Sequence, residues 1–169
     1  MEPIPFKEPI FTFAEACEAT GASEAWLRTF IQRDKTGTLG TKQRHGRLLF
    51  SLMDIGSIAL LHTLNAHLKV SPAAAWEVRN SLETFILQHL AELDTYSSRT
   101  LCAGFDTDGT LLIWHVNSEG VLETFNDAAD ERMHETFIAS RRAHIAIPIT
   151  AIFDPVRSAQ MIAEKWESE

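Results

Sequence analysis

Residues 11–55 read FTFAEACEATGASEAWLRTFIQRDKTGTLGTKQRHGRLLFSLMDI, and this stretch decides the fold of the N-terminal half of the chain. Thr12 followed by Glu15 has the spacing of a capping box, which predicts a helix over residues 12–20. Gly21 adopts the left-handed backbone of a helix C-terminus at little cost, so the first helix is expected to end there. The stretch therefore begins with a short helix and a tight turn.

A second helix is expected after Ser23, whose hydroxyl can cap its N-terminus. Its apolar side chains recur at helical spacing, at Trp26, Leu27, Phe30 and Ile31. The basic residues 42–47 and the apolar residues 48–50 then predict a hairpin. Two short helices joined by a glycine-containing turn can place one helix in the major groove of DNA. A cationic hairpin beside them can contact phosphates.

Two more helices are predicted downstream of the hairpin. Ser51 and Asp54 form a second cap signal, so a third helix is expected over residues 52–68. Ser71, followed by proline at the first helical position, predicts a fourth helix over residues 72–93. The fourth helix carries a broad apolar stripe and is long enough to serve as a dimer arm.

The character of the sequence changes near residue 95. Four strands are expected, over residues 100–105, 110–116, 121–125 and 144–149. A helical stretch is expected over residues 127–140, and a final helix is expected to begin at Asp154-Pro155 by the rule of a cap followed by proline. The predicted fold class is α+β, with an extended arm over 1–10, a mostly helical module over 11–94 and a small antiparallel-sheet module over 95–169.

The charge of the chain is segregated along the sequence. The net charge is −8, yet residues 26–50 carry six cations against Asp34 alone, an excess of +5. Residues 81–169 carry six cations against fifteen acids, an excess of −9. Because the local field rather than the total charge steers a polyanion, residues 26–50 are the expected contact surface. The acidic half is expected to face away from any nucleic acid.

Composition predicts a cytoplasmic protein. The chain is 45% hydrophobic and 22% charged, as in soluble globular proteins. Cys17 and Cys102 are isolated in apolar runs, which favours a reducing compartment without disulfides. No apolar run approaches the ~18 residues that cross a bilayer. Three prolines and the acids Glu2 and Glu8 near the N-terminus argue against a signal peptide.

Residues 105–112, FDTDGTLL, suggest an enzyme that the rest of the chain does not support. Haloacid-dehalogenase-like phosphatases use this pattern, with one carboxylate as nucleophile and the other as acid/base beside Mg²⁺. Only 59 residues follow Thr110, too few for the sheet, lysine and acidic pair which that chemistry requires. Asp-Gly between apolar runs is also a hairpin signal, so we predict a turn and no catalysis. The histidines lack the i, i+4 spacing of helical metal sites, and no metal or cofactor is expected.

Several short motifs occur in a fixed order over residues 11–79. They are Phe11-Thr12-Phe13-x-Glu15-Ala16-Cys17-x-x-Thr20-Gly21-Ala22-Ser23, Leu27-Arg28, Gly46-Arg47-x-x-Phe50-Ser51-x-x-Asp54-Ile55 and Val70-Ser71. In order and spacing they resemble the winged helix-turn-helix domain of MerR-like regulators and the related excisionase-type proteins. The chain departs from that pattern at Thr29-Phe30, where members often carry a tyrosine pair, and it lacks the effector-sensing cysteines of the metal-responsive branch.

The resemblance implies a set of DNA-contacting residues. In that family the second helix enters the major groove and the hairpin, or wing, contacts the backbone. The positions implied are Arg28, Thr29, Gln32 and Arg33 on the second helix, and Lys42, Gln43, Arg44 and Arg47 in or beside the wing.

The expected function is therefore sequence-specific binding of double-stranded DNA by a transcriptional regulator, which would act as a homodimer through residues 72–93 and have no membrane partner. Two alternatives remain open. One is an excisionase-like architectural DNA-binding factor. The other is a protein–protein interaction module with a degenerate wing, whose acidic C-terminal half binds a partner. A ligand or protein partner of residues 95–169 is left unassigned.

Overall fold

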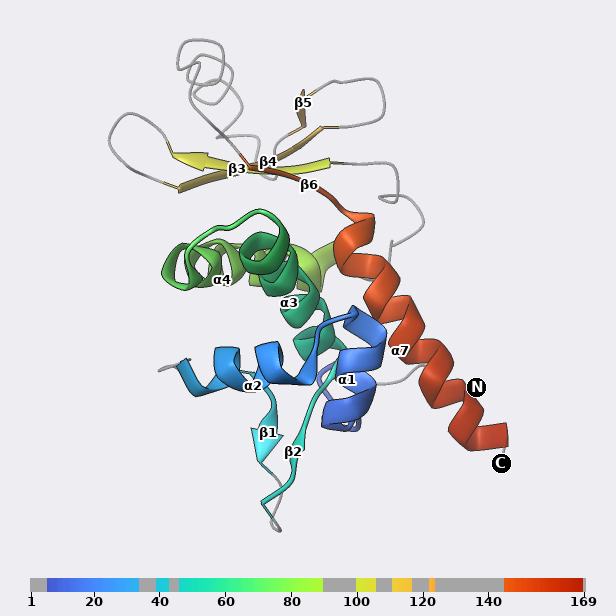
Figure 1. Cartoon of the computed structure of the whole chain (residues 1–169). Coiled ribbons are helices and arrows are strands. Elements are labelled where there is room, and N and C mark those ends of the chain that lie inside the picture. Colours follow the sequence, from blue (N-terminus) through green and yellow to red (C-terminus); the bar gives the residue numbers. More distant parts are fainter. Residues whose placement is uncertain are drawn as a thin grey trace. The chain divides into compact units, whose positions relative to one another are not determined.

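The computed structural model describes residues 6–33, 39–42, 46–89, 100–105, 111–116, 122–123 and 145–168, and the side chains of 6–33, 39–42, 46–80 and 147–166 (Figure 1). The chain forms two compact units. Unit 1 comprises Met1–Arg79 and Ala151–Glu169, and unit 2 comprises Asn80–Thr150. Helices dominate unit 1 and an antiparallel sheet lies in unit 2, so the α+β class predicted from the sequence is confirmed.

The first two helices begin where the local signals predict, and the first also ends at the predicted glycine. In α1 (Phe13–Thr20), the backbone N–H of Thr12 donates to the Glu15 carboxylate at 2.7 Å and the Glu15 N–H donates back to the Thr12 hydroxyl at 3.4 Å. Gly21 ends α1 with φ 68°. α2 (Glu24–Arg33) is capped by Ser23, whose hydroxyl accepts from the Trp26 N–H at 3.3 Å.

A small hairpin follows α2. β1 (Thr41–Lys42) pairs antiparallel with β2 (Leu48–Leu49). Phe11 extends this hairpin on the other side of β2, since its N–H donates to the Phe50 carbonyl at 2.9 Å and the Phe50 N–H donates back at 2.8 Å. The strand segment before α1 is thereby joined to the end of the hairpin.

Asp54 connects the hairpin to the next helix. α3 (Leu52–His62) begins with the predicted capping box, in which Asp54 accepts from the Ser51 N–H at 2.8 Å. The second oxygen of the same buried carboxylate accepts from the Gly40 N–H at 3.2 Å. One side chain therefore fixes both the start of α3 and the base of the hairpin.

α3 forms the centre of unit 1, with residues Leu52–Leu61 all buried. Its helical path continues beyond His62 as predicted, but as a π-helical turn, η1 (Thr63–His67), rather than as α-helix. α4 (Pro72–His89) begins at the predicted proline. The Ser71 hydroxyl caps its N-terminus by accepting a hydrogen bond from the Ala74 N–H at 3.3 Å. Residues 90–93 of the predicted fourth helix lie outside the described residues.

The final helix differs from the prediction in both start and placement. α7 (Thr150–Ser168) begins at Thr150, with Pro155 inside it, and not at Asp154-Pro155. A proline inside a helix removes one backbone hydrogen bond. Ile152 and Phe153, which precede it, are 1% and 2% exposed. Burial of two such side chains contributes about 1.5–3 kcal/mol each, enough to offset the lost bond.

α7 belongs to unit 1, whereas the sequence grouped it with residues 95–169. Its buried face packs against α3 at Gly56, where an added Cβ would lie 3.4 Å from Val156 and 3.6 Å from Ile152. Figure 1 shows α7 alongside α1 and α3. The N-terminal module is thus completed by residues that lie some seventy positions further along the chain.

Unit 2 contains the predicted antiparallel sheet. Its strands are β3 (Thr100–Phe105), β4 (Leu111–Val116), β5 (Leu122–Glu123) and β6 (Ile145–Pro148), in the order β5-β4-β3-β6. β3 and β4 pair from Thr100↔Val116 to Phe105↔Leu111, the register of a hairpin. The predicted Asp-Gly turn and the predicted helix over 127–140 lie outside the described residues.

Candidate nucleic-acid interface

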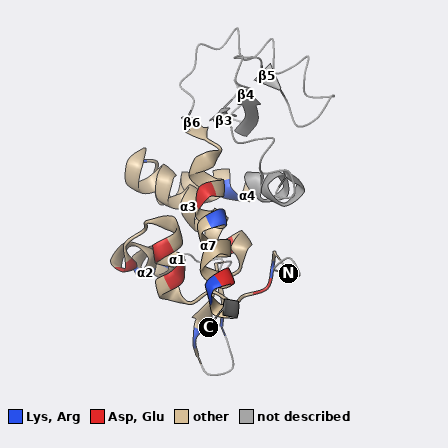
Figure 2. Cartoon of the chain, turned by 90° about the vertical axis from the view of Figure 1, so that its right-hand side faces the viewer, with Lys and Arg blue, Asp and Glu red and all other residues tan. Residues whose placement is uncertain are grey.

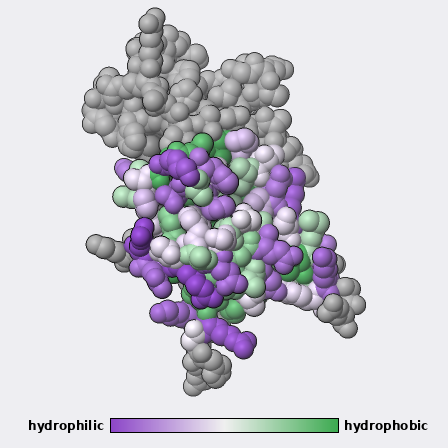
Figure 3. Space-filling model, viewed as in Figure 1, coloured by the Kyte–Doolittle hydropathy of each residue, from purple (hydrophilic) through white to green (hydrophobic). Residues whose placement is uncertain are grey.

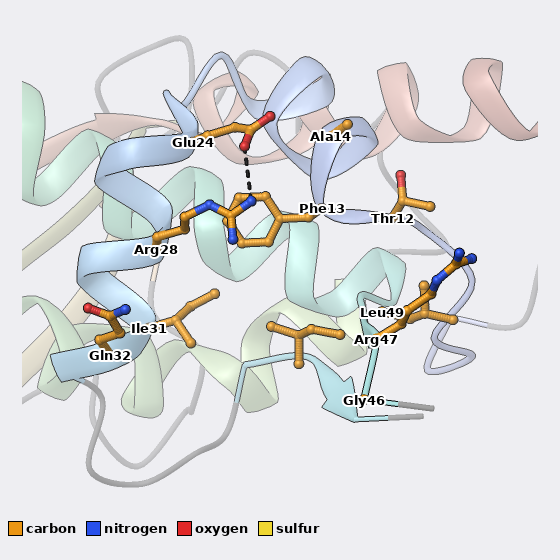
Figure 4. A pocket seen from close by; sticks show the side chains of 11 residues that line it. Thr12, Phe13, Ala14, Glu24, Arg28, Ile31, Gln32, Gly46, Arg47 and Leu49 are labelled. Atoms are coloured by element: carbon orange, nitrogen blue, oxygen red, sulfur yellow. Dashed lines mark hydrogen bonds and ion pairs between the residues drawn. The ribbon is translucent and has the colours of Figure 1, made fainter. Parts of the chain in front are cut away.

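A groove lies between the start of α1, the exposed face of α2 and the β1–β2 hairpin (Figure 4). Its volume is about 550 Å³. The residues that line it are Thr12, Phe13, Ala14, Glu24, Arg28, Ile31, Gln32, Gly46, Arg47, Leu48 and Leu49. Three of the eight residues that the sequence singled out, Arg28, Gln32 and Arg47, therefore share one surface, although they come from two elements.

Arg28 is held in place by two neighbours. Its guanidinium pairs with the Glu24 carboxylate at 3.1 Å, one helical turn away, and both side chains are more than half exposed. The same guanidinium lies 4.4 Å from the centroid of the Phe13 ring, on α1. A cation over an aromatic face is attracted by the ring quadrupole, so Arg28 lies against the wall of the groove.

The other predicted residues of α2 are exposed but differ in what they contact. The Thr29 hydroxyl donates to the Ala25 carbonyl at 2.8 Å and keeps its oxygen lone pairs available to a ligand. Gln32 lines the groove and Arg33 ends the helix, both exposed. These side chains are placed to meet a ligand in front of α2.

The hairpin contributes two described cations. Lys42 on β1 and Arg47, next to β2, are both exposed, and Arg47 lines the groove opposite α2. Gln43 and Arg44, the other two predicted wing residues, lie outside the described residues. Figure 4 shows Arg47 and Arg28 on different walls of the same groove.

The surface around the groove is polar and of mixed sign. Figure 3 shows hydrophilic residues over the face formed by α2 and the hairpin. α1 carries Glu15 and Glu18, and α2 carries Glu24. Acidic residues are red in Figure 2. The local excess of cations in the sequence is therefore partly balanced in space, because Glu24 pairs with Arg28 on the same face of α2.

Sequence reasoning missed the two groove residues that contact the Arg28 guanidinium, Glu24 and Phe13. Glu24 precedes Arg28 by four positions, a spacing that favours an ion pair on a helix, so this contact could have been predicted. Phe13 could not, because its contact with Arg28 depends on how α1 and α2 are packed. The edge of the Phe13 ring also packs on Phe50, with centroids 5.9 Å apart.

An aromatic cluster supports α2 from behind. The Trp26 ring stacks on the Phe30 ring and contacts the His62 ring in an edge-on arrangement. In each pair the ring centroids are 4.7 Å apart. The Trp26 indole N–H donates to the Asn65 side chain at 3.1 Å. Burial lowers the pKa of His62, and the neighbouring His67 lowers it further. Trp26, which is half-buried, and Phe30, which is buried, thus pack behind α2 and leave its polar side to the groove.

Cys17 lies on α1 as a half-buried thiol. Burial raises its pKa, and the charge of Glu24 raises it further. The protonated thiol is therefore favoured over the nucleophilic thiolate.

No protein-family model matches the chain, and no curated protein matches its sequence. Among the described residues, no three metal-binding side chains lie together. The helices in that part of the chain include none with the length and apolar character of a membrane span.

Proposed function

We propose that the chain is a sequence-specific, double-stranded DNA-binding transcriptional regulator built on a MerR-like winged helix-turn-helix. In this proposal α2 enters the major groove, whose width admits an α-helix, and the β1–β2 hairpin is the wing. The groove between them receives the sugar-phosphate strand that borders the major groove.

The observation that carries the proposal is the shared groove of Arg28, Gln32 and Arg47. Arginine and glutamine are the side chains that form bidentate contacts with guanine and adenine. An exposed arginine on the opposite wall supplies a contact to phosphate, which positions a protein on DNA without selecting a sequence. A helix that can reach bases and a hairpin that can hold a strand are therefore on the same side of unit 1.

A homodimer through residues 72–93 belongs to the same proposal, because regulators of this type bind two half-sites. In α4 the side chains of Ala75 and Val78 are buried within unit 1, so they are not accessible to a second copy of the chain. The dimer contact would therefore be made by other residues of the stretch 72–93. Light scattering at high micromolar concentration tests for the dimer, and a monomer would contradict it.

Selection of bound sequences from a random duplex pool tests the function directly. A regulator should enrich one sequence and bind it at roughly 10⁻⁸ M or tighter in physiological salt, some 10³-fold better than unrelated DNA. Enrichment of bent or flexible sites without a base consensus would favour an architectural factor instead.

A second candidate is a protein–protein interaction module. The pairing of Arg28 with Glu24 favours it, because a neutralised arginine is a weaker ligand for a polyanion. Absence of duplex binding at low salt, where phosphate contacts are strongest, would select this candidate.

A further inference from the structure

The end of α7 contacts the strand segment that precedes α1. The Trp166 ring lies 5.6 Å from the Phe11 ring, and the two planes are inclined by 43°. Phe11 is fully buried, whereas Trp166 remains 43% exposed. A half-exposed tryptophan therefore covers one side of Phe11.

Phe11 is in turn connected to the wall of the groove. Its backbone is paired with that of Phe50 through two hydrogen bonds. The Phe50 ring packs against Phe13, and the Phe13 ring carries the Arg28 guanidinium. A continuous series of contacts therefore leads from Trp166 to Arg28 through three phenylalanines.

The helix that carries Trp166 is anchored along its earlier turns. Val156 and Ile152 pack at Gly56 of α3, and Val156 and Ala159 are fully buried. A single residue, Ile149, separates α7 from β6 of unit 2 along the chain. Because a packed helix moves as a rigid element, a displacement of its start is carried to Trp166.

We infer that Trp166 is a positioning residue for Arg28, through which α7 regulates the candidate DNA interface. Trp166 holds Phe11 in place, and Phe11 keeps Phe50 and Phe13 where the Phe13 ring supports Arg28. A partner or ligand that displaces α7 would release Arg28 from the wall of the groove. The effect on DNA rests on the proposed function, whereas the effect on Arg28 does not.

Trp166→Leu tests the inference in the full-length chain, with Met161→Leu as the matched control. Met161 lies on the same helix and is 56% exposed. The first readout is the NMR signal of the Arg28 Nε–H, which the ring current of Phe13 shifts and which requires no DNA. We expect this signal to move in Trp166→Leu, to stay in place in Met161→Leu and to be restored in Trp166→Phe.

The second readout is affinity for a selected duplex. Trp166→Leu should weaken binding roughly 2- to 30-fold, the range of coupling through packed side chains. The same change should have no effect in an Arg28→Ala background, because the two residues would act through one contact.

The two readouts separate the inference from the proposed function. An unchanged Arg28 signal in a folded Trp166→Leu protein overturns the inference, as does strict additivity with Arg28→Ala. If Trp166→Leu does not fold, Trp166→Met takes its place and is read in the same way: a moved Arg28 signal supports the inference, and an unchanged signal overturns it. A moved signal in a protein that binds no duplex supports the positioning role and contradicts only the DNA-binding proposal.

Discussion

The guanidinium of Arg28 lies 4.4 Å from the centroid of the Phe13 ring, so the arginine expected to lead DNA contact is already held against α1. It is also paired with Glu24 at 3.1 Å. A restrained arginine loses less side-chain entropy when it binds a ligand than a mobile one does. The restraint therefore favours recognition, while the carboxylate opposes contact with a phosphate.

Replacement of the two groove arginines should have different effects on DNA binding. Arg28→Ala should reduce discrimination between sequences by about 1–3 kcal/mol, because a base contact is lost. Arg47→Ala should weaken binding to all sequences alike and reduce the salt slope by about 1. Fluorescence anisotropy on selected and unrelated duplexes across salt concentrations measures both effects. Unchanged binding in the double variant would contradict the DNA proposal.

Glu24→Gln should strengthen DNA binding. The change removes the negative charge beside Arg28 and keeps the size of the side chain, while the Phe13 ring still holds the guanidinium against the groove wall. Because exposed ion pairs contribute about 0–1 kcal/mol, the expected gain is no more than about fivefold, with little change in the free energy of unfolding. Glu18→Gln, an exposed acid of α1 outside the groove, is the control in the same titration. A loss of affinity in Glu24→Gln would show that the pair is needed to orient Arg28.

Two glycines of the hairpin should respond differently to alanine. Gly40 and Gly46 both have positive φ, at 72° and 78°, so each substitution carries the cost of a left-handed backbone, about 1–2 kcal/mol. At Gly40 the new Cβ would also lie 3.0 Å from Leu48 and Phe50, whereas at Gly46 it meets open space. Urea denaturation should therefore show a clearly larger loss for Gly40→Ala. Equal losses would mean that the hairpin base adjusts freely.

The stability of unit 1 should fall in mild acid because of His62. Burial lowers the pKa of His62 in the folded state, so the unfolded state binds the proton more readily. The contribution of neutral His62 to the free energy of unfolding is complete above the ordinary histidine pKa of 6.5. This contribution decreases as the pH falls through that value toward the lower pKa of the folded state. The free energy of unfolding, measured between pH 8 and pH 5, should depend less on pH in His62→Phe, which keeps a ring beside Trp26. His67→Gln separates the smaller contribution of the neighbouring imidazole.

The starts of α1, α2, α3 and α4 were all predicted from the sequence. Each depends on a serine or threonine cap within three or four residues of its hydrogen-bond partner, as with Thr12 and Glu15 or Ser51 and Asp54. Signals of this range are complete in the local sequence. The strands of unit 2 were predicted for a similar reason, since apolar alternation on both sides of a turn defines a hairpin.

Only the tertiary structure decided where α7 begins and what it completes. The pair Asp154-Pro155 is a strong local start signal, yet burial of Ile152 and Phe153 extends the helix to Thr150. The contact of Arg28 with Phe13 and that of Trp166 with Phe11 were equally invisible in the sequence. Capping involves residues a few positions apart, whereas burial depends on which distant segments exclude water together, and that is decided only when the chain has folded.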